Sequence, residues 1–492
     1  MTELPRLSRT VVPAPKLRER VLQFGTGNFL RAFTGWMIDG LNRRGLFDGG
    51  IVVVQATPRG LAAKFNQQDG LYTVLLRGIE SGRLVETRHV VTAVTRAIDP
   101  YVDFEALLAC ARNPELRFII SNTTEAGIAY DPGDKATDRP PAGFPGKLTL
   151  LLLERYRTLP THGFVLLPCE LIERNGERLR DAVQMTARGW GLESRFIDWI
   201  AAANVFADTL VDRIVPGYPH DEAAAMFESW GYTDELLAAG EPFHFFAIAP
   251  PDIRRELPLE QGDFSVVFAD DITPYRERKV RILNGSHTSF ALAGYLGGKN
   301  TVRECMDDPV LREFVETLLR SEIAPTLALP AAEVSAFIDA TLDRYSNPFL
   351  KHLLLSISLN TVSKFRARLV PVIAKFVRLH GRPPARVSFG LAAMIAFYRG
   401  TEIRDRALIG RRDGAEYRIT DEPGVLETFA GLWSQTDPSP DTLTDAVLGQ
   451  TGWWGCDLRE IPDLAAAVAV HLSAILTHGV PAALARLGSG RT

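Results

Sequence analysis

The hydrophobic pattern near the start of the chain predicts a strand, a turn, a helix and a second strand. RVLQF (20–24) and IVVVQA (51–56) are short apolar runs of the kind found in buried parallel strands. Between them, apolar residues recur about every four positions from Phe29 to Leu41, which is the spacing of an amphipathic helix. Residues 20–56 therefore read as a βαβ unit.

The same alternation of strands and helices continues farther along the chain. LRFIISNTT (116–124) and GFVLLPCE (163–170) are further apolar runs with the character of buried strands. The helical patterns DFEALLACARN (103–113) and GKLTLLLLERYRTL (146–159) precede them. Strands that alternate with helices in this way are typical of a doubly wound parallel sheet.

The pattern changes after about residue 272. Helical periodicity dominates from there on, beginning with PYRERKVRILNGSHTSFALAGYLGG (274–298). We therefore expect an α/β fold in which a doubly wound Rossmann-type domain spans residues 1–275. A mostly α-helical domain should span residues 276–492.

Composition narrows the class of function. The 492 residues are 46% hydrophobic and 23% charged, with a net charge of −4, and no basic face that would suit nucleic acid stands out. The first residues have no apolar core of a secretory signal, and no uninterrupted apolar run reaches about 18 residues, so we expect no membrane span. The four cysteines lie far apart, and the histidines show no metal-binding spacing. We expect a cytoplasmic protein without a metal.

The glycine turn GTGNFLR (25–31) is the first candidate site. Gly25 permits a tight turn, and Gly27 would let the backbone approach a pyrophosphate at a helix N-terminus, although Leu30 replaces the third glycine of the usual fingerprint. The motif alone is weak, but the strand before it and the helix after it strengthen the prediction of a dinucleotide site.

The second strand ends in Gln55 where a ribose-binding carboxylate is usual, and Arg59 follows four residues later. Gln55 can bind a ribose, whereas Arg59 would favour a 2′-phosphate, so NAD and NADP both remain open on this position alone. SNTTEAGI (121–128) follows another strand and should also meet the cofactor or the substrate. The candidate cofactor-binding residues are Gln23, Phe24, Gly25, Thr26, Gly27, Asn28, Phe29, Leu30, Arg31, Gln55, Asn122, Thr123 and Glu125.

The string KVRILNGSH (279–287) carries three polar groups in an apolar setting. On a regular α-helix, Asn284 would lie about 140° from Lys279 and His287 about 80° from it, so that all three border one cleft. Such a set suits hydride transfer at a carbon that bears an oxygen. Donors stabilise the oxygen, while a lysine whose pKa is lowered by burial exchanges its proton.

The spacing K-x4-N-x2-H resembles the catalytic signature of the long-chain polyol and sugar-acid dehydrogenases, the mannitol dehydrogenase family. The details look most like the branch that interconverts ketohexuronates and hexonates. The resemblance runs through most of the chain, in QFGTGNFLRAF (23–33), SNTTEAGI (121–128), PCELIERNG (168–176), DTLVDRIVPG (208–217), ERKVRILNGSHT (277–288), RYSNPFLKH (344–352) and SISLNTVSKFRARLVP (356–371).

The resemblance implies NAD as the cofactor and a role for each matching residue. Lys279 would be the general acid–base, Asn284 would hold the reacting oxygen, and His287 would position the substrate. Asp212 would support the lysine, although an internal ion pair with its neighbouring arginine is an equally good explanation. Mannitol-type relatives have Asp-Asn where this chain has Glu-Leu at 170–171, so Asn175 is the nearest candidate for a second oxygen-binding asparagine.

The block around residues 356–368 bears on the substrate class. Mannitol-type relatives have an arginine where this chain has Ser356, eight residues before a substrate-binding lysine, here Lys364. Arg366 and Arg368 add cations that could bind a sugar-acid carboxylate, but the three cannot all face one ligand on a helix. We expect Lys364 with one arginine to bind the carboxylate, the alternative being solvated surface charges.

The expected partner is therefore a small sugar acid, bound by a monomer or a small homo-oligomer. Within the family, the sister ketohexuronate and a mannitol-type polyol are alternative substrates. An epimerase that retains its NAD and a nucleotide sensor without catalysis are alternatives from other classes.

Overall fold

The computed structural model describes residues 4–488, apart from the side chain of Glu125, and the chain forms two compact units. The first unit extends to Ile272, except for Ile79–Arg83, and the second comprises Ile79–Arg83 and the chain from Thr273 onward. The main division thus follows Ile272, three residues before the predicted position.

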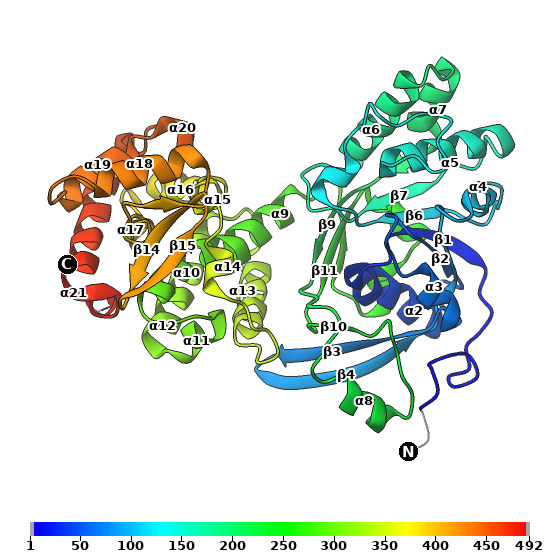
Figure 1. The fold of residues 1–492 in the computed structure, drawn as a ribbon, viewed down its shortest axis with the longest axis horizontal. Coiled ribbons are helices and arrows are strands. Elements are labelled where there is room, and N and C mark those ends of the chain that lie inside the picture. Colours follow the sequence, from blue (N-terminus) through cyan, green and yellow to red (C-terminus); the bar gives the residue numbers. More distant parts are fainter. Residues whose placement is uncertain (1–3, 489–492) are drawn as a thin grey trace. The chain divides into compact units, whose positions relative to one another are not determined.

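A six-stranded parallel sheet forms the first unit's centre (Figure 1). The strand order is β5-β2-β1-β6-β7-β8, which corresponds to 3-2-1-4-5-6 when the strands are counted along the chain. This is the Rossmann order and confirms the predicted fold. The strands are β1 (Glu19–Phe24), β2 (Gly50–Val54), β5 (Val94–Ile98), β6 (Phe118–Ser121), β7 (Val165–Pro168) and β8 (Val205–Phe206).

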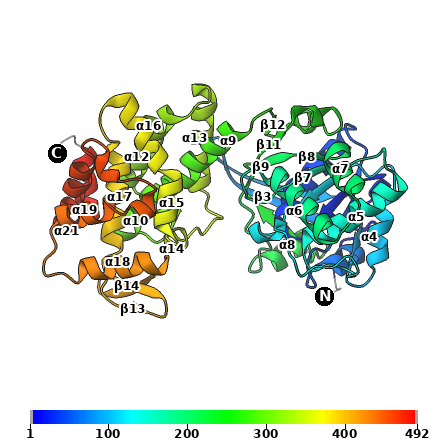
Figure 2. The same cartoon turned by 90° about the horizontal axis from the view of Figure 1, so that it is seen from above.

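Helices cover both faces of this sheet, because alternate strand residues pack into two separate cores. Val21 and Ile51 belong to the core that contains α2. Their neighbours Leu22 and Val52 belong to the core of α5 and α6. Figure 1 labels helices of both groups, and Figure 2 shows α4, α5, α6 and α7 from above. One group is α1 (Asn28–Leu30), η1 (Arg31–Gly35), α2 (Trp36–Arg43) and α3 (Ala62–Gln67), and the other is α4 (Phe104–Ala111), α5 (Phe144–Thr158), α6 (Asn175–Gly189) and α7 (Ser194–Ala203).

The first unit also contains two small sheets that the sequence patterns did not predict. In one of them, the hairpin β3–β4 turns at Ser81–Gly82, where both residues have positive φ (52° and 73°), and this tip belongs to the second unit. The strands are β3 (Tyr72–Glu80), β4 (Arg83–Val91) and β10 (Ala238–Gly240) in one sheet, and β9 (Asp208–Asp212), β11 (Phe245–Ala249) and β12 (Val266–Phe268) in the other; the remaining helical segments are η2 (Glu125–Ile128), α8 (Ala223–Trp230), η3 (Pro251–Arg255) and η4 (Leu259–Gly262).

The second unit is mostly helical, as predicted, with α10 and α17 among its most buried elements. It also contains a three-stranded sheet of β13 (Ile403–Arg404), β14 (Ala407–Arg412) and β15 (Ala415–Ile419). The helices are α9 (Thr273–Lys279), η5 (Val280–Gly285), α10 (Ser286–Leu296), α11 (Val302–Asp307), α12 (Pro309–Thr317), η6 (Leu318–Ile323), η7 (Ala324–Thr326), α13 (Ala331–Tyr345), α14 (Leu354–Ile357), α15 (Thr361–Arg368), α16 (Val370–His380), α17 (Ala385–Phe397), α18 (Pro423–Trp433), α19 (Pro440–Leu448), α20 (Thr451–Trp454), η8 (Leu458–Glu460) and α21 (Leu464–Gly488).

Two functionally interesting helices are interrupted by a turn of π-helix. The helix after the glycine turn is π-helical over η1, and the helix that carries the predicted catalytic residues is π-helical over η5. π-turns are rare and occur frequently at functional sites. A third such segment, η6, carries no predicted site residue.

One helix is apolar and long enough that length and composition alone would allow a membrane crossing, namely Leu464–Leu487 in α21. It is broken by a non-helical Gly479, with Pro481 two residues later, and it packs along α17 and α19. A helix in the core of a folded domain has the same composition, so this feature is weak evidence for a membrane.

Candidate active site

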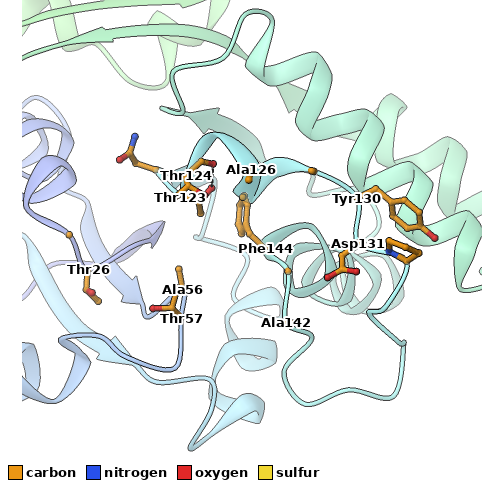
Figure 3. A pocket seen from close by; sticks show the side chains of 16 residues that line it. Thr26, Ala56, Thr57, Thr123, Thr124, Ala126, Tyr130, Asp131, Ala142 and Phe144 are labelled. Carbon is orange, nitrogen blue, oxygen red and sulfur yellow. Dashed lines mark hydrogen bonds between the residues drawn. The ribbon is translucent and has the colours of Figure 1, made fainter. Parts of the chain in front are cut away.

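A cavity of about 620 Å³ opens in the first unit beside the carboxyl ends of β1, β2 and β6, where ligands bind in doubly wound folds. Figure 3 shows Thr26, Ala56 and Thr57 on one side and Tyr130 and Asp131 on the other. The lining residues are Thr26, Gly27, Ala56, Thr57, Asn122, Thr123, Thr124, Ala126, Gly127, Ala129, Tyr130, Asp131, Pro132, Ala142, Gly143 and Phe144.

Gly25 and Gly27 contribute to the turn in different ways. Gly25 has φ of +124°, and a Cβ there would lie 3.3 Å from Leu30 Cδ1, so both conformation and space favour glycine. Gly27 lines the cavity, and a Cβ there would meet nothing within 4 Å. The backbone at Gly27 is therefore open to a ligand, as a pyrophosphate at a helix N-terminus requires. The turn fits a dinucleotide.

Arg31 lies beneath the turn rather than in the cavity. It is 2% exposed, and its Nη1 donates to Thr26 O at 3.0 Å while Nη2 donates to Asn28 Oδ1. Burial lowers the pKa of Arg31 to about 10, so the guanidinium keeps its charge at neutral pH. Arg31 thus fixes the loop and places a positive charge beside the site for a diphosphate.

The loop after β6 is held by a buried carboxylate. Glu170 Oε1 accepts hydrogen bonds from the Thr123 backbone N at 2.8 Å and its hydroxyl at 3.0 Å, and Oε2 accepts from Ser121 Oγ at 3.1 Å. Burial raises the pKa of Glu170. The side chain of Asn122 donates to Cys169 O at 2.7 Å. These contacts join the ends of β6 and β7 and present Asn122 and Thr123 to the cavity.

The other predicted cofactor residues divide into lining and supporting positions. Thr26 lines the cavity, whereas Gln23, Phe24 and Leu30 are buried behind it, and Gln23 Nε2 donates to Gly25 O at 3.0 Å. Phe29 is partly buried and packs against the core of the α2 side of the sheet. The side chain of Glu125 lies outside the described part of the structure.

Gln55 does not line the cavity. It is 4% exposed, its Nε2 donates to Asp99 Oδ2 at 3.1 Å, and its Oε1 accepts from Ala62 N at 3.3 Å. The predicted ribose contact therefore has no support from the geometry, because the amide is committed to the protein interior. Ala56 and Thr57 form the wall at this strand end instead, and Arg59 is exposed nearby.

The predicted catalytic residues of the second unit share one helix, and its π-turn alters their directions. The turn over η5 adds a residue relative to an α-helix and rotates the following positions back by about 100°. Asn284 then lies about 40° from Lys279, and His287 about 20° from it on the other side. The three side chains therefore lie closer to one face than a regular α-helix would place them.

Asn284 and His287 differ in burial. The side chain of Asn284 is half-buried and makes no hydrogen bond to any other described residue, so its donors are available. His287 is 6% exposed, and its Nε2 has no hydrogen-bond partner within residues 4–488. Its ring lies 4.4 Å from that of Tyr345 and 5.0 Å from that of His352. Burial, followed by the influence of His352, Arg344 and Arg368, holds the pKa of His287 well below its usual value.

We expect acid to destabilise the fold through His287. Its lowered pKa means that the unfolded chain takes up a proton below pH 6.5 while the folded chain does not. Stability should then fall as pH decreases below 6.5, by up to about 1.4 kcal/mol per pH unit. Thermal unfolding between pH 7.5 and 5 measures this, and His287→Gln should flatten the dependence. The exposed His380→Gln is the control, and equal slopes in all three proteins would contradict the expectation.

Lys364 and Arg368 form a pair of cations on α15. Lys364 Nζ donates to Ile357 O at 3.1 Å, and Arg368 Nη1 donates to Asn284 O at 3.3 Å and to Thr288 Oγ1 at 3.0 Å. Burial lowers the pKa of Lys364, and the charge of Arg368 lowers it further. Neither cation makes an ion pair in the described part of the chain.

Arg366 points elsewhere. It is exposed, and its guanidinium lies beside Gly455, where an added Cβ would come within 3.0 Å of Nη2. Of the three cations predicted to bind substrate, the structure thus brings Lys364 and Arg368 together and leaves Arg366 on another side of the helix.

The predicted site residues Asn175 and Asp212 lie in the first unit. Asn175 is fully buried, and its Nδ2 donates to Pro168 O at 2.8 Å and to Thr209 O at 3.2 Å, while its Oδ1 accepts from Thr209 N at 2.9 Å. The Asn175 amide thus joins backbone groups of two segments and has no N–H left to donate to a substrate oxygen. Leu171, at the asparagine position of mannitol-type relatives, is 62% exposed.

Asp212 ends β9 and is 5% exposed. The neighbouring Arg213 is turned toward the backbone, since its guanidinium donates to Phe243 O at 3.1 Å and to Pro242 O at 2.9 Å and lies over the Trp36 ring. Internal pairing of Arg213 with carbonyls accounts for its burial. The role of Asp212 beside the lysine stays a prediction.

Some residues around these sites had no predicted role. Tyr345 and His352 surround His287, and both belong to the segment RYSNPFLKH, whose resemblance to the family was the available signal. Tyr130, Asp131 and Phe144 line the nucleotide cavity from a loop without a recognisable motif. No group of three or more metal-ligating side chains occurs among the residues that the structure describes.

Comparison with known proteins covers nearly the whole chain. Residues 19–261 match the profile of the mannitol dehydrogenase Rossmann domain, and residues 271–476 match that of the mannitol dehydrogenase C-terminal domain. The altronate oxidoreductase of Yersinia enterocolitica is 43% identical over 487 residues, 97% of this chain and 99% of the relative. That of Klebsiella pneumoniae is 43% identical over 482 residues, 96% and 98% of the two chains.

Solved structures show the same fold at lower sequence identity. Substrate-free D-sorbitol dehydrogenase superposes with a TM-score of 0.82 at 24% identity, covering 97% of this chain and 100% of the other. Mannitol 2-dehydrogenase of Pseudomonas fluorescens, solved with NAD and D-mannitol, has a TM-score of 0.68 at 22% identity, with coverage of 99% and 97%.

Proposed function

The chain belongs to the mannitol dehydrogenase family, and from this premise we propose that it is an NAD-dependent oxidoreductase that interconverts a ketohexuronate and a hexonate. D-Tagaturonate and D-altronate are the proposed pair, in line with the altronate oxidoreductases that resemble the chain along its length. The observation that supports an acidic substrate is the pair Lys364 and Arg368. Neither cation has an ion-pair partner among the described residues, and Arg368 donates a hydrogen bond to the backbone carbonyl of Asn284.

A carboxylate is the natural ligand of this pair. Lys364 and Arg368 repel each other, and the charge of Asp421 offsets this at Lys364 without forming an ion pair. An anion placed between the two cations removes the repulsion and accepts charge-assisted hydrogen bonds. Arginine can bind a carboxylate with two N–H groups, whereas lysine acts as a point charge. A neutral polyol offers no such compensation, so the pair favours a sugar acid over mannitol-type substrates.

The proposed cofactor is NAD, held in the cavity of the first unit. The open backbone at Gly27 would meet the pyrophosphate, Arg31 would supply positive charge beneath it, and Asn122 and Thr123 would contact the nucleotide from the adjacent strand end. When bound as NADH, it supplies the hydride for reduction of the ketone.

The second unit would supply the proton chemistry. In reduction Lys279 gives a proton to the oxygen of the former ketone, and in oxidation it takes that proton back. The Asn284 amide, whose donors are unoccupied, stabilises the negative charge on the oxygen. His287 remains neutral at pH 7, because burial disfavours its charged form, and so offers one nitrogen as donor or acceptor to a substrate hydroxyl.

A substrate panel tests the proposal. D-Tagaturonate, D-fructuronate and D-fructose are each added to enzyme with excess NADH or NADPH, and the loss of absorbance is compared with product formed. We expect D-tagaturonate with NADH to give the highest kcat/KM, with one NADH consumed per hexonate formed. Preference for D-fructuronate would indicate the sister activity, and preference for D-fructose a polyol dehydrogenase. Conversion without net NADH consumption would indicate an epimerase.

The same proposal places the enzyme in the cytoplasm, as a monomer or small homo-oligomer that acts on soluble sugar acids.

A further inference from the structure

A buried tyrosine hydroxyl contacts the π-turn in each of the two helices that carry the proposed chemistry. Where hydrogen bonding changes from the α to the π pattern, a backbone carbonyl loses its usual partner and needs another donor. In both helices a buried tyrosine from a separate element of the same unit donates to a carbonyl of the π segment. Arg213 Nη1 also donates to Ala32 O within η1, and Ser286 donates from its backbone N to Leu283 O and from its Oγ to Ile282 O at the end of η5.

Tyr345 serves the π-turn of the second unit. Its hydroxyl donates to Leu283 O at 2.7 Å and lies 2.8 Å from Ser286 Oγ, so that it contacts both the π segment and the first residue of α10. Its ring packs against His287 and is 4% exposed. Tyr345 therefore contacts the helix between Lys279 and His287, directly beside Asn284.

Tyr72 serves the π-turn of the first unit. Its hydroxyl donates to Arg31 O at 3.1 Å, at the first residue of the π segment. Tyr72 is 1% exposed, and a Cβ added to Gly35 would lie only 2.2 Å from its hydroxyl oxygen. The absence of a side chain at Gly35 is what allows the hydroxyl to reach the turn.

We propose that Tyr345 and Tyr72 are positioning residues that keep these two turns in the π form. Tyr345 sets the directions of Lys279, Asn284 and His287, and Tyr72 sets the direction of Arg31 beneath the glycine turn. The roles assigned to the helices rest on the proposed function, whereas the two contacts do not.

The consequence of losing a hydroxyl follows from helix geometry. Reversion of a π-turn to an α-turn rotates the residues on either side relative to each other by about 100°. Even partial relaxation would move Asn284 and His287 against Lys279, and a displacement of about 1 Å at a reacting group costs about 100-fold in rate. The hydroxyl thus controls alignment although it touches neither substrate nor cofactor.

Tyr345→Phe keeps the ring and removes only the hydroxyl. We expect kcat to fall between about tenfold and about 100-fold. The Kd for NADH should stay within about twofold, because the nucleotide cavity lies in the other unit. Amide hydrogen exchange should become faster across residues 280–287.

Tyr417→Phe is the matched control. Tyr417 is also buried in the second unit, and its hydroxyl donates to Phe397 O at 2.6 Å, but this carbonyl ends the regular helix α17. The Tyr417→Phe variant should therefore lose about as much thermal stability as Tyr345→Phe, while its kcat stays within about twofold of that of the unmodified protein. A kcat in Tyr345→Phe equal to that of Tyr417→Phe would overturn the proposal for Tyr345.

Tyr72→Phe should give the opposite kinetic pattern. We expect the Kd for NADH, measured by fluorescence titration, to rise between about threefold and about thirtyfold, since Arg31 and the glycine turn lose their alignment. At saturating NADH, kcat should recover to within about twofold of the original value. An unchanged Kd would overturn the proposal for Tyr72.

These outcomes are separable from failure of the proposed function. If the unmodified protein reduces no ketouronate, the proposed function fails, while hydrogen exchange in Tyr345→Phe and NADH titration in Tyr72→Phe still report on the two turns. If the unmodified protein is active and both tyrosine variants behave like Tyr417→Phe, the positioning inference alone fails.

Discussion

Lys279→Ala is expected to lower kcat for D-tagaturonate reduction by about 10²–10⁴-fold, because the oxygen loses the group that exchanges its proton. NADH should still bind with unchanged affinity, since the nucleotide cavity is built from the first unit alone. Steady-state kinetics and fluorescence titration of NADH measure the two quantities. A small primary amine added to the variant should restore part of the rate, as it can occupy the space of the missing ammonium.

A matched lysine separates this effect from loss of charge in general. Lys375 is a partly buried lysine on α16, and Lys375→Ala should leave kcat within about twofold of the original. A fully active Lys279→Ala would leave the chemistry without its acid–base and would favour a nucleotide sensor or a different proton donor.

Lys364→Gln should reveal how the enzyme selects an acid. Glutamine keeps a donor at this position but removes the charge, and a hydrogen bond to a charged partner contributes about 1.5–3 kcal/mol. We expect KM for D-tagaturonate to rise about 10–100-fold. Any residual activity with neutral D-fructose should be unchanged or improved, since this substrate has no carboxylate to lose. The measurement is kcat/KM for both substrates in a buffer without multivalent anions.

Arg366→Gln is the control for this prediction, because the same helix carries it but its guanidinium lies beside Gly455. Its KM values should match those of the original enzyme. If Arg366→Gln raises KM and Lys364→Gln does not, the carboxylate binds on the other side of α15 and the assignment of the cation pair is wrong.

The central architecture was predictable because its signal is local. Runs such as RVLQF and IVVVQA are mostly apolar on both alternating faces, as is typical of a strand buried on both faces, and the sheet places their alternate residues in two cores. The hairpins were missed, although their turns carry a signal. Ser81–Gly82 and Asp413–Gly414 both have two consecutive positive φ angles, and such dipeptides are typical of two-residue hairpin turns.

The directions of side chains at the site were less predictable than the elements that carry them. A regular helix puts Asn284 far around from Lys279, and nothing in KVRILNGSH indicates the extra residue in the turn. The π form depends on Tyr345, which lies about sixty positions later and is a tertiary contact. Helical geometry applied to sequence alone therefore places these candidate residues at other angles than the folded helix does.

For two amide side chains, the sequence predicted a contact with a ligand, and the structure shows contacts within the protein instead. Gln55 and Asn175 have the chemistry of ligand-binding residues, and the sequence places both at strand ends. In the structure both amides are consumed by buried backbone groups or by Asp99. Whether an amide faces a ligand or the interior is decided by unpaired backbone groups around it, and these become visible only in the folded chain.

The cation pair on α15 also affects the choice of buffer for assays and crystallisation. If Lys364 and Arg368 bind the substrate's carboxylate as proposed, sulfate, phosphate or citrate from a buffer should compete for the same place, because the two cations repel each other. Affinities recorded in such solutions would understate the enzyme's preference for acidic sugars, whereas crystals grown from them would show the buffer anion where the sugar's carboxylate belongs.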